Sequence, residues 1–365
     1  MNGENTLMSI SEIIAQAAER KASDIHLVPD ARILLRVDGA LIPLSEERLA
    51  PSVIEQQISA LLTEAQKERL KCTGELVFVY AASDNCRVRV GIYRQRGTYA
   101  MTLRLLPSEI PEPQKLGLPE SLVALTQRQR GLVLVAGETG SGRTTTLASL
   151  TAAAAHVTAR TIITLGSPVE YQHPQGSSLI LQREIGSDSA SYEAALRMTQ
   201  WQDVDVIEVG ELRGQEAVEA ALDAAEAGHL VLAGLAVDSV AAAIERMTAG
   251  TSTQRQQRLR VQLSEVLAGI VTQRLLPRQA SERVPDASGR VAAFELLLAD
   301  TASRRMIRTG SIEQLSSILE AGRETGMQSM DDSIYELYMK SDISAETAMA
   351  YAHDPEEMQQ KLQLF

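Results

Sequence analysis

The sequence predicts an α/β protein in which a small α+β domain precedes a doubly wound parallel sheet with a helical tail. Three observations lead to this fold class. Aromatic residues make up 3% of the chain, so the cores must be aliphatic, as in proteins with parallel sheets. Beyond residue 130, short apolar strand runs alternate with helical patterns. Between the two halves, four prolines fall within residues 107–119, which prevents a helix and predicts a stiff linker.

We interpret residues 1–106 as the α+β domain. Apolar residues at helical spacing predict a helix over 7–20, and a second helix is expected at roughly 51–70. Five alternating or β-branched runs predict a mostly antiparallel sheet. These runs are Ile25–Val28, Ile33–Val37, Leu76–Tyr80, Val88–Tyr93 and Tyr99–Leu105.

We interpret residues 120–300 as the parallel-sheet domain. Continuous apolar runs predict four buried strands, and a helix is expected from about Thr144 to Val157. The strand runs are Leu132–Ala136, Thr161–Leu165, Val204–Val209 and Leu230–Leu235. From 254 to 276, apolar positions define one face of a predicted helix, at Leu259, Leu263, Val266, Leu267 and Ile270. The polar residues 301–365 predict a helical C-terminal region.

Charge and cysteine content exclude several classes of protein. Forty-seven acidic and 35 basic residues give a net charge of −12, which disfavours an obligate nucleic-acid binder because such proteins carry a basic face. Cys72 and Cys86 are too few for a disulfide framework or a four-thiolate zinc site. Because neither a secretory signal nor a membrane-spanning apolar run is visible, the chain is expected to be cytoplasmic.

The strongest local motif lies between the strand run ending at Ala136 and the helix that follows it. It has the spacing of a phosphate-binding P-loop, with Arg143 where lysine is expected. Glycines let backbone N–H groups approach phosphate oxygens, and a helix N-terminus favours an anion. The expected nucleotide-binding residues are Gly137, Glu138, Thr139, Gly140, Ser141, Gly142, Arg143, Thr144 and Thr145. Thr144 would offer its hydroxyl to Mg²⁺. The alternative is a glycine-rich turn that binds no ligand.

The substitution at Arg143 affects binding and catalysis differently. Lysine is a compact point charge and arginine is a wide planar fork, so the exchange is not conservative. Arginine can still pair with phosphate through two hydrogen bonds. We therefore expect phosphate binding to survive while the transition-state geometry suffers.

Further motifs are spread over nearly the whole chain. The first half carries Ala22-Ser23-Asp24-Ile25-His26-Leu27, Arg36-Val37-Asp38-Gly39, Arg87-Val88-Arg89-Val90 and Arg94-Gln95-Arg96-Gly97. The second half carries Gln182–Gly186, Asp205–Arg213, Ala225–Val231, Gln273–Pro277 and Gly326–Asp331. Together they resemble the type IV pilus retraction ATPases, the PilT family of secretion-motor P-loop ATPases. Extension-type relatives are longer and usually carry a four-cysteine motif, so the two cysteines of this chain favour the retraction type.

The resemblance implies a PAS-like N-terminal α+β domain and a RecA-like P-loop ATPase domain with a helical C-terminal region. It also implies a hexameric ring, either homomeric or mixed. ATP and Mg²⁺ would be the cofactors, an inner-membrane pilus platform protein would be the partner, and twitching motility would be the process. Nucleic acid is not an expected partner. Such a protein would lie in the cytoplasm or peripherally at the inner face of the plasma membrane.

Roles for individual residues follow from the same resemblance. Glu211, at the end of the Walker B strand, would orient or deprotonate the attacking water, and His229 would sense the γ-phosphate. The alternatives are an exposed glutamate at a strand end and a histidine bonded to the backbone. The candidate arginine fingers are Arg89, Arg94, Arg96 and Arg104, each of which could instead be a solvated strand residue.

The chain departs from the family pattern around the phosphate site. Gly166 and Ser167 replace an acidic pair after the second core strand, and Ala236 replaces the second histidine of the histidine motif. Gly214 replaces an acid after the Walker B arginine. Glu208 replaces an apolar residue within the strand, and because a buried unpaired carboxylate is costly, we expect it to be paired or to lie at an edge.

Two function hypotheses remain. In the first, the chain is a PilT-like ATPase of a type IV pilus retraction system, with weak or absent ATP hydrolysis. In the second, it is a non-catalytic structural or regulatory partner of an active paralogue in a pilus or type II secretion system. The changes cluster at the phosphate site while the scaffold motifs stay intact, and this pattern points toward the second hypothesis.

Overall fold

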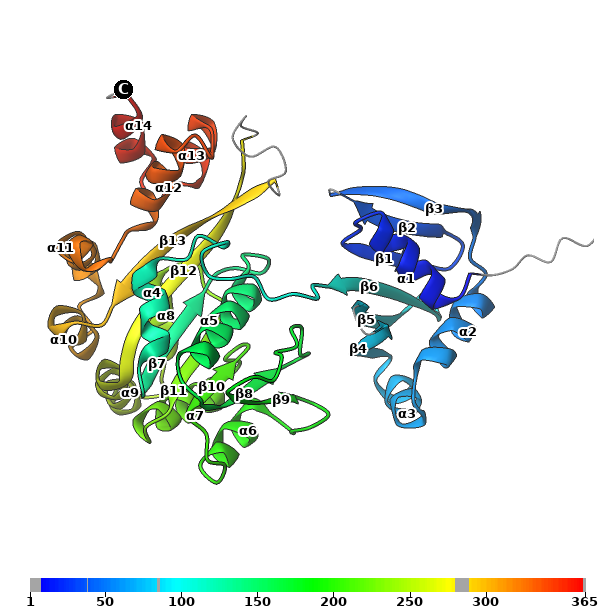
Figure 1. Ribbon diagram of the computed structural model, residues 1–365, viewed down its shortest axis with the longest axis horizontal. Helices are drawn as coiled ribbons and strands as arrows, with labels where there is room; N and C mark the ends of the chain where they lie inside the picture. Colours follow the sequence, from blue (N-terminus) through cyan, green and yellow to red (C-terminus); the bar gives the residue numbers. More distant parts are fainter. Residues whose placement is uncertain (1–7, 38, 84–85, 280–288, 364–365) are drawn as a thin grey trace, which may run out of the picture. The chain divides into compact units, whose positions relative to one another are not determined.

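The computed structural model describes residues 8–37, 39–83, 86–279 and 289–363, and the chain divides into two compact units (Figure 1). The first unit comprises the residues up to Glu109 together with the later segment Pro168–Gln172. The second unit comprises Ile110–Ser167 and the residues from His173 onward. Asp38, which belongs to one of the family motifs, lies outside the described residues.

The first unit is an antiparallel sheet packed against helices. Its strand order is β3-β2-β1-β6-β5-β4, and every neighbouring pair is antiparallel, which confirms the predicted sheet. The strands are β1 (Asp24–Leu27), β2 (Arg32–Val37), β3 (Ala40–Arg48), β4 (Glu75–Ser83), β5 (Cys86–Gln95) and β6 (Thr98–Leu106). The helices are α1 (Ile10–Glu19), α2 (Pro51–Leu61) and α3 (Glu64–Thr73).

Local capping explains where the helices of the first unit begin. Ser9 and Glu12 form a capping box at the start of α1, which buries its apolar face in the core. The helix predicted at roughly 51–70 is two helices, because Thr63 and Gln66 form a second capping box that starts α3. The sequence patterns missed β3, an edge strand whose residues are at least partly exposed and therefore give no apolar run.

The second unit is built on a seven-stranded sheet with the order β13-β12-β7-β11-β10-β8-β9. The neighbouring pairs from β12 to β9 are parallel, whereas β13 is antiparallel to β12. The strands are β7 (Gly131–Ala136), β8 (Thr161–Gly166), β9 (Leu179–Glu184), β10 (Val206–Val209), β11 (Leu230–Leu235), β12 (Leu267–Pro277) and β13 (Arg290–Leu298). The predicted parallel sheet is confirmed, and the structure adds strands that the sequence patterns did not predict.

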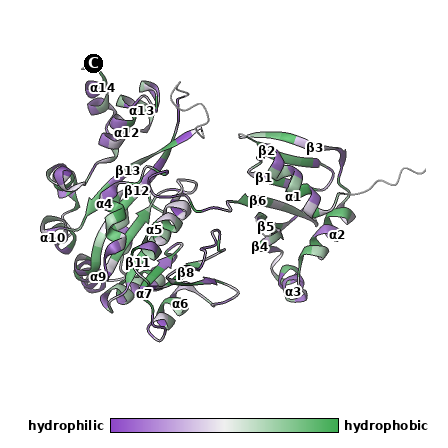
Figure 2. Cartoon of the chain, viewed as in Figure 1, coloured by the Kyte–Doolittle hydropathy of each residue, from purple (hydrophilic) through white to green (hydrophobic). Residues whose placement is uncertain are grey.

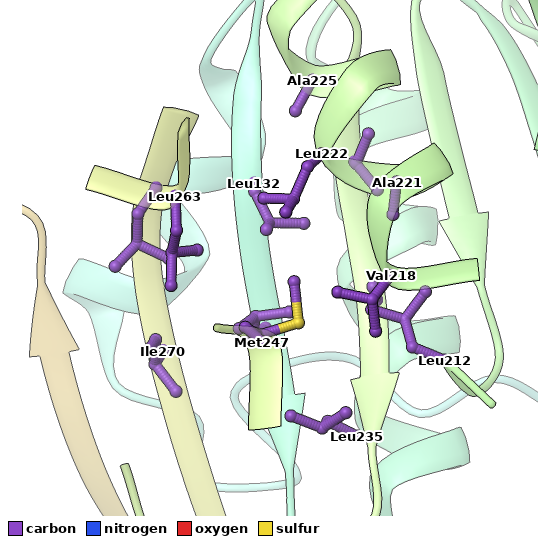
Figure 3. Packing of buried hydrophobic residues seen from close by; sticks show 14 of the residues in the cluster. Leu132, Leu212, Val218, Ala221, Leu222, Ala225, Leu235, Met247, Leu263 and Ile270 are labelled. Atoms are coloured by element: carbon purple, nitrogen blue, oxygen red, sulfur yellow. The ribbon is translucent and has the colours of Figure 1, made fainter. Parts of the chain in front are cut away.

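Helices cover both faces of this sheet. One face packs against α4 (Glu120–Ala124), the turn Leu125–Gln127 and α5 (Arg143–Val157). The other packs against α6 (Tyr192–Thr199), α7 (Gln215–Glu226), α8 (Val240–Met247) and α9 (Thr253–Val266). Figure 3 shows this second core, where Leu132 of β7 lies beside Leu222 of α7. Because both faces are covered, the interior strands are hydrophobic along their length, as Figure 2 shows.

The helix predicted over 254–276 is wrong in its second half. Helix α9 ends at Val266, and β12 starts at Leu267 beside β7. The first seven residues of β12 are buried, so the strand has no polar alternation that could separate it from an apolar helix face. At Gly269 an added Cβ would lie 2.7 Å from a methyl group of Leu125, so glycine marks a close approach here rather than a helix.

The C-terminal region is helical, as predicted for residues 301–365. It contains α10 (Thr301–Thr309), α11 (Leu315–Ala321), α12 (Met330–Met339), α13 (Ala345–Tyr351) and α14 (Pro355–Gln363). The last three pack around their own cluster of buried residues with Leu276 of β12 and Ala293 of β13. Within the described ranges, no helix is both long enough and apolar enough to cross a membrane.

Candidate nucleotide-binding site

A glycine-rich loop, residues 137–142, joins β7 to α5 at the carboxyl edge of the large sheet. Gly137, Gly140 and Gly142 have φ angles of +154°, +86° and +93°, a region that favours glycine. Gly142 is the N-cap of α5, and no side chain caps the helix there. The N–H groups and the dipole of such a helix start attract an anion.

Arg143, the first residue of α5, points its guanidinium toward the end of β10. Its Nη2 lies 4.0 Å from Oε2 of Glu211, and its side chain is 13% exposed. Burial lowers the pKa of Arg143, while Glu211 opposes this change. Nη1 is buried without a hydrogen-bond partner among the described residues. Because a guanidinium stays charged in proteins, this orphaned donor suits an anionic acceptor.

Glu211 follows the carboxyl end of β10 and lies between two arginines. Its Oε2 accepts a hydrogen bond from Nη2 of Arg213 at 3.2 Å and faces Arg143 on its other side. The structure therefore places Glu211 beside Arg143, at the end of the glycine-rich loop. The role of Glu211 in orienting water stays a prediction. A general base needs a lone pair directed at the attacking water, and here one carboxylate oxygen is already engaged by cations.

The positions where the resemblance implies an acidic pair border the same edge. Gly166 is the last residue of β8, the strand next to β10, and Ser167 follows it. Glu170, the acid that remains nearby in the sequence, belongs to the first unit. There its Oε1 accepts a hydrogen bond from Nη1 of Arg89 at 2.6 Å, and Arg87 donates to its main-chain carbonyl. Neither Gly166 nor Ser167 can offer a carboxylate to a metal or a water.

The two positions of the histidine motif lie at opposite ends of β11. The parallel register pairs Leu235 with Ala136, so Ala236 follows at the edge where the loop begins. His229 precedes the strand at the other edge, about 20 Å away if each residue advances about 3.3 Å. Its Nδ1 lies 2.7 Å from the carbonyl oxygen of Val204. Within one chain His229 therefore lies at the edge away from the loop, and its role as a γ-phosphate sensor stays a prediction.

The four candidate arginine fingers lie on β5, β6 and the turn between them, in the first unit. Arg96 is exposed in that turn, and its φ angle is +49°. The other three have partners inside their own unit. These pairs are Arg89 with Glu170, Arg94 with Tyr99, and Arg104 with Asp24. Their contribution to a nucleotide site stays a prediction.

Glu208 has the partner that the sequence required. Its Oε2 accepts a hydrogen bond from Oγ1 of Thr151 at 2.6 Å and lies 3.7 Å from Nε2 of His173. Burial raises the pKa of Glu208 to about 7 and lowers the pKa of His173 to about 4. The carboxyl group lies on the α5 side of β10, buried beneath the helix.

Gln273 contacts the loop, although the sequence patterns assigned it no role. It lies on β12, is 4% exposed, and hydrogen-bonds to both Ser141 and Thr146. A polar residue inside an apolar strand run is the sequence signal that could have found it, since buried polar side chains are nearly always hydrogen-bonded.

The residues of this edge fit a phosphate group better than a metal ion. The orphaned Nη1 of Arg143 and the uncapped start of α5 both suit an anion. For Mg²⁺ the site offers the exposed hydroxyl of Thr144. Across the described ranges, no group of three or more His, Cys, Asp or Glu side chains could hold a metal, whereas Mg²⁺ in nucleotide sites is usually held by one or two carboxylates.

A glycine-rich loop between a strand and a helix at the carboxyl edge of a parallel sheet is the arrangement typical of P-loop proteins. A family model described as type II/IV secretion system protein matches residues 3–360, so the chain belongs to that family. This membership and the relatives described next confirm the resemblance.

Several relatives are type IV pilus ATPases. The type IV pilus ATPase PilU of Pseudomonas aeruginosa is 31% identical over 357 residues, which cover 98% of this chain and 92% of PilU. The type IV pilus retraction ATPase PilT of the same organism is 32% identical over 349 residues, which cover 96% of this chain and 99% of PilT. A crystal structure of the pilus retraction motor PilT with bound ADP matches with a TM-score of 0.88 and 38% identity, over 97% of this chain and 100% of that one.

Proposed function

We propose that this chain is a subunit of a PilT-like motor ring in a type IV pilus system, which binds ATP weakly and hydrolyses it slowly or not at all. The observation that carries the proposal is the contact between Arg143 and Glu211. The cation of the phosphate loop is buried against the carboxylate that would activate water. Similarity to PilT and PilU supports the pilus system, a hexameric assembly and a platform protein as the partner.

Each residue of the site has a distinct part in this proposal. The main-chain N–H groups of residues 137–143 would bind phosphate oxygens, and Nη1 of Arg143 would donate to the same group. Glu211 would orient a water near the terminal phosphate. Mg²⁺, when bound, supplies charge neutralisation, and Thr144 would hold it.

The side chains absent from the site set the expected rate. Removing a single donor to the transition state costs about 10²–10³ in rate. Several changes would affect the hydrolysis step together. The acidic pair is absent at Gly166 and Ser167, the histidine is absent at Ala236, and one oxygen of Glu211 is engaged by arginines. We therefore expect turnover at least about 100-fold below that of an active pilus motor.

A motor that hydrolyses ATP at the rate of an active pilus motor is the second candidate function. Retention of Glu211 at the end of β10, beside the phosphate loop, favours it. The two candidates differ in one quantity, the rate at which a purified ring releases phosphate from ATP.

Calorimetry and phosphate release on the full chain test the proposal. We expect a dissociation constant for ATP on the order of 0.1–1 mM, about −4 to −5.5 kcal/mol, with little phosphate release. Arg143→Met should weaken binding further, whereas Arg197→Met, at an exposed arginine on α6 that pairs with Glu193, should not. Micromolar affinity with turnover at the rate of an active motor, or no binding at millimolar ATP, would contradict the proposal.

A further inference from the structure

The side chain of Gln273 links β12 to the end of the glycine-rich loop and to the helix that follows it. Its Nε2 donates a hydrogen bond to the main-chain carbonyl oxygen of Ser141, at 2.5 Å. Its Oε1 accepts a hydrogen bond from Oγ1 of Thr146, on the first turn of α5, at 2.6 Å. The register of β12 with β7 pairs Thr272 with Ala136, so Gln273 is level with the first residue of the loop. One side-chain amide therefore connects β12 to the loop and to α5.

The loop glycines also pack directly against Gln273. A Cβ added at Gly142 would lie 2.6 Å from Nε2 of Gln273, and one added at Gly137 would lie 2.8 Å from the carbonyl oxygen of Gln273. Real Cβ atoms do not approach other atoms that closely. Gly142 thus leaves room for the side chain of Gln273, and Gly137 leaves room for the main chain of β12, in addition to the demands of their φ angles.

The hydrogen bond to Ser141 fixes the direction of the next N–H group. In a trans peptide the carbonyl group and the following N–H point in opposite directions. Because the Ser141 carbonyl points at Gln273, the N–H of Gly142 points away from β12. That N–H lies at the start of α5, where the helix dipole attracts an anion.

We propose that Gln273 is a positioning residue for phosphate binding, which holds the peptide between Ser141 and Gly142 so that its N–H is available to a phosphate oxygen. The inference rests on the proposed nucleotide-binding function and gives it a determinant outside the loop. Gln273 does not contact the phosphate itself. It acts through the orientation of the loop, so its loss should weaken phosphate binding while leaving the sheet in place.

A glutamate at this position separates positioning from simple packing. A neutral carboxylic acid has one O–H donor and an acceptor oxygen, so it can meet both Ser141 and Thr146 as the amide does. An ionised carboxylate has no donor for the Ser141 carbonyl and adds negative charge next to the phosphate. Gln273→Glu should therefore bind nucleotide in a proton-dependent way.

Other charged groups near this position are shared by every variant. Glu138 and Arg143 belong to the loop and to α5. Arg274 and Glu295 lie on β12 and β13, on the opposite face of the sheet from Gln273, because Glu295 pairs with Thr272. Every variant carries these groups and binds the same ATP, so each variant is compared with the wild type at the same pH.

The experiment compares Gln273→Glu, Gln273→Met and a control, Gln328→Met, in the full chain. Gln328 is a matched glutamine, because its Nε2 donates to the Phe294 carbonyl at 3.0 Å on β13, which lies one strand further from the loop than β12. ATP affinity is measured by calorimetry at pH 5.5 and pH 8. Gln273→Met should bind at least about tenfold more weakly than the wild type at both pH values, whereas Gln328→Met should bind equally. Gln273→Glu should lie within about threefold of the wild type at pH 5.5 and fall at least about tenfold below it at pH 8.

Equal affinity of Gln273→Met and the wild type, or the same ratio for Gln273→Glu at both pH values, would overturn the inference. If Gln273→Met does not fold, the two pH values of Gln273→Glu carry the test. If the wild type binds no ATP, the proposed function fails, and hydrogen exchange still tests the inference. Gln273→Met should then speed exchange of the amides of residues 137–143 at least about tenfold relative to Gln328→Met. Unchanged exchange would contradict it.

Discussion

The glycine-rich loop, residues 137–142, keeps more of the family pattern than the strand ends beside it. The loop between β7 and α5 keeps its glycines, its uncapped helix start and the hydrogen bonds to Gln273. The adjoining ends of β8 and β11 carry Gly166 and Ala236, where a motor would use acids and a histidine. The main chain of the loop suits an anion, and the neighbouring positions Gly166 and Ala236 offer neither a carboxylate nor an imidazole, although Glu211 remains. We therefore expect nucleotide binding and hydrolysis to be separable in this chain.

The largest expected effect comes from filling the loop. In Gly137→Ala, the new Cβ would lie 2.3 Å from Oγ of Ser141, at a φ angle of +154°. We expect a loss of about 3 kcal/mol or more of stability and no measurable ATP binding.

Gly140→Ala is the matched control for that change. Its φ angle is +86°, and nothing lies within 4 Å of the added Cβ, so backbone strain alone should cost about 1–2 kcal/mol. Urea unfolding and calorimetry of the two variants check the difference. If the two variants lost equal stability and equal ATP affinity, the close packing around Gly137 would add nothing to the cost of backbone strain.

A smaller effect concerns the buried pair behind β10. The pKa of Glu208 is raised from 4.5 to about 7, so the folded protein holds this proton more tightly than the unfolded chain does. The stability it contributes is complete below about pH 4.5 and is lost as the pH rises through about 7. Glu208→Gln keeps an acceptor for Thr151 and removes the titration.

Urea unfolding at pH 5 and pH 8 measures this contribution. The stability of Glu208→Gln relative to the wild type should rise by about 2–3 kcal/mol between the two pH values. The pKa of His173 is lowered to about 4, so this imidazole costs stability as the pH falls below about 6.5. That cost is present in both proteins and drops out of the difference. A pH-independent difference would show that Glu208 does not ionise in this range.

The smallest expected effect is at His229. Because it lies at the amino end of β11, away from the loop, His229→Asn should change ATP affinity less than about twofold. Ala236→Asp, at the loop edge of the same strand, places a negative charge near the phosphate and should weaken binding by more than that. If His229→Asn weakens ATP binding and Ala236→Asp does not, it is wrong that the Ala236 end of β11 borders the phosphate and that the His229 end lies away from it.

Sequence patterns predicted the parts of the fold that have a clear period or a specific loop. The helix α1 has an apolar face and a capping box, and the loop before α5 has its glycines at fixed spacing. They failed at β12, because a strand buried on both faces has no alternation. They also missed β3, whose exposed edge gives no apolar run.

The site was predicted less completely than the fold. The resemblance predicted that Glu211 acts at the nucleotide, and it lies beside Arg143 at the end of the loop. The cost of burying an unpaired carboxylate predicted a partner for Glu208, which is Thr151. The sequence alone could not show that His229 lies at the far edge, because that depends on the register of β11 with β7. Nor could it find the role of Gln273, whose partner Thr146 is separated from it by 127 residues.

One measurement tests most directly whether an intact phosphate loop lies among degenerate side chains. The variant Arg143→Lys, Gly166→Glu, Ser167→Asp and Ala236→His restores the point charge, the acidic pair and the loop-edge histidine together. Because such groups act as a unit, single reversions should do little. The combined variant should release phosphate from ATP at least about 100-fold faster than the wild type, and adding Glu211→Ala should abolish the gain. A combined variant that folds and binds ATP but stays as inactive as the wild type would contradict the account.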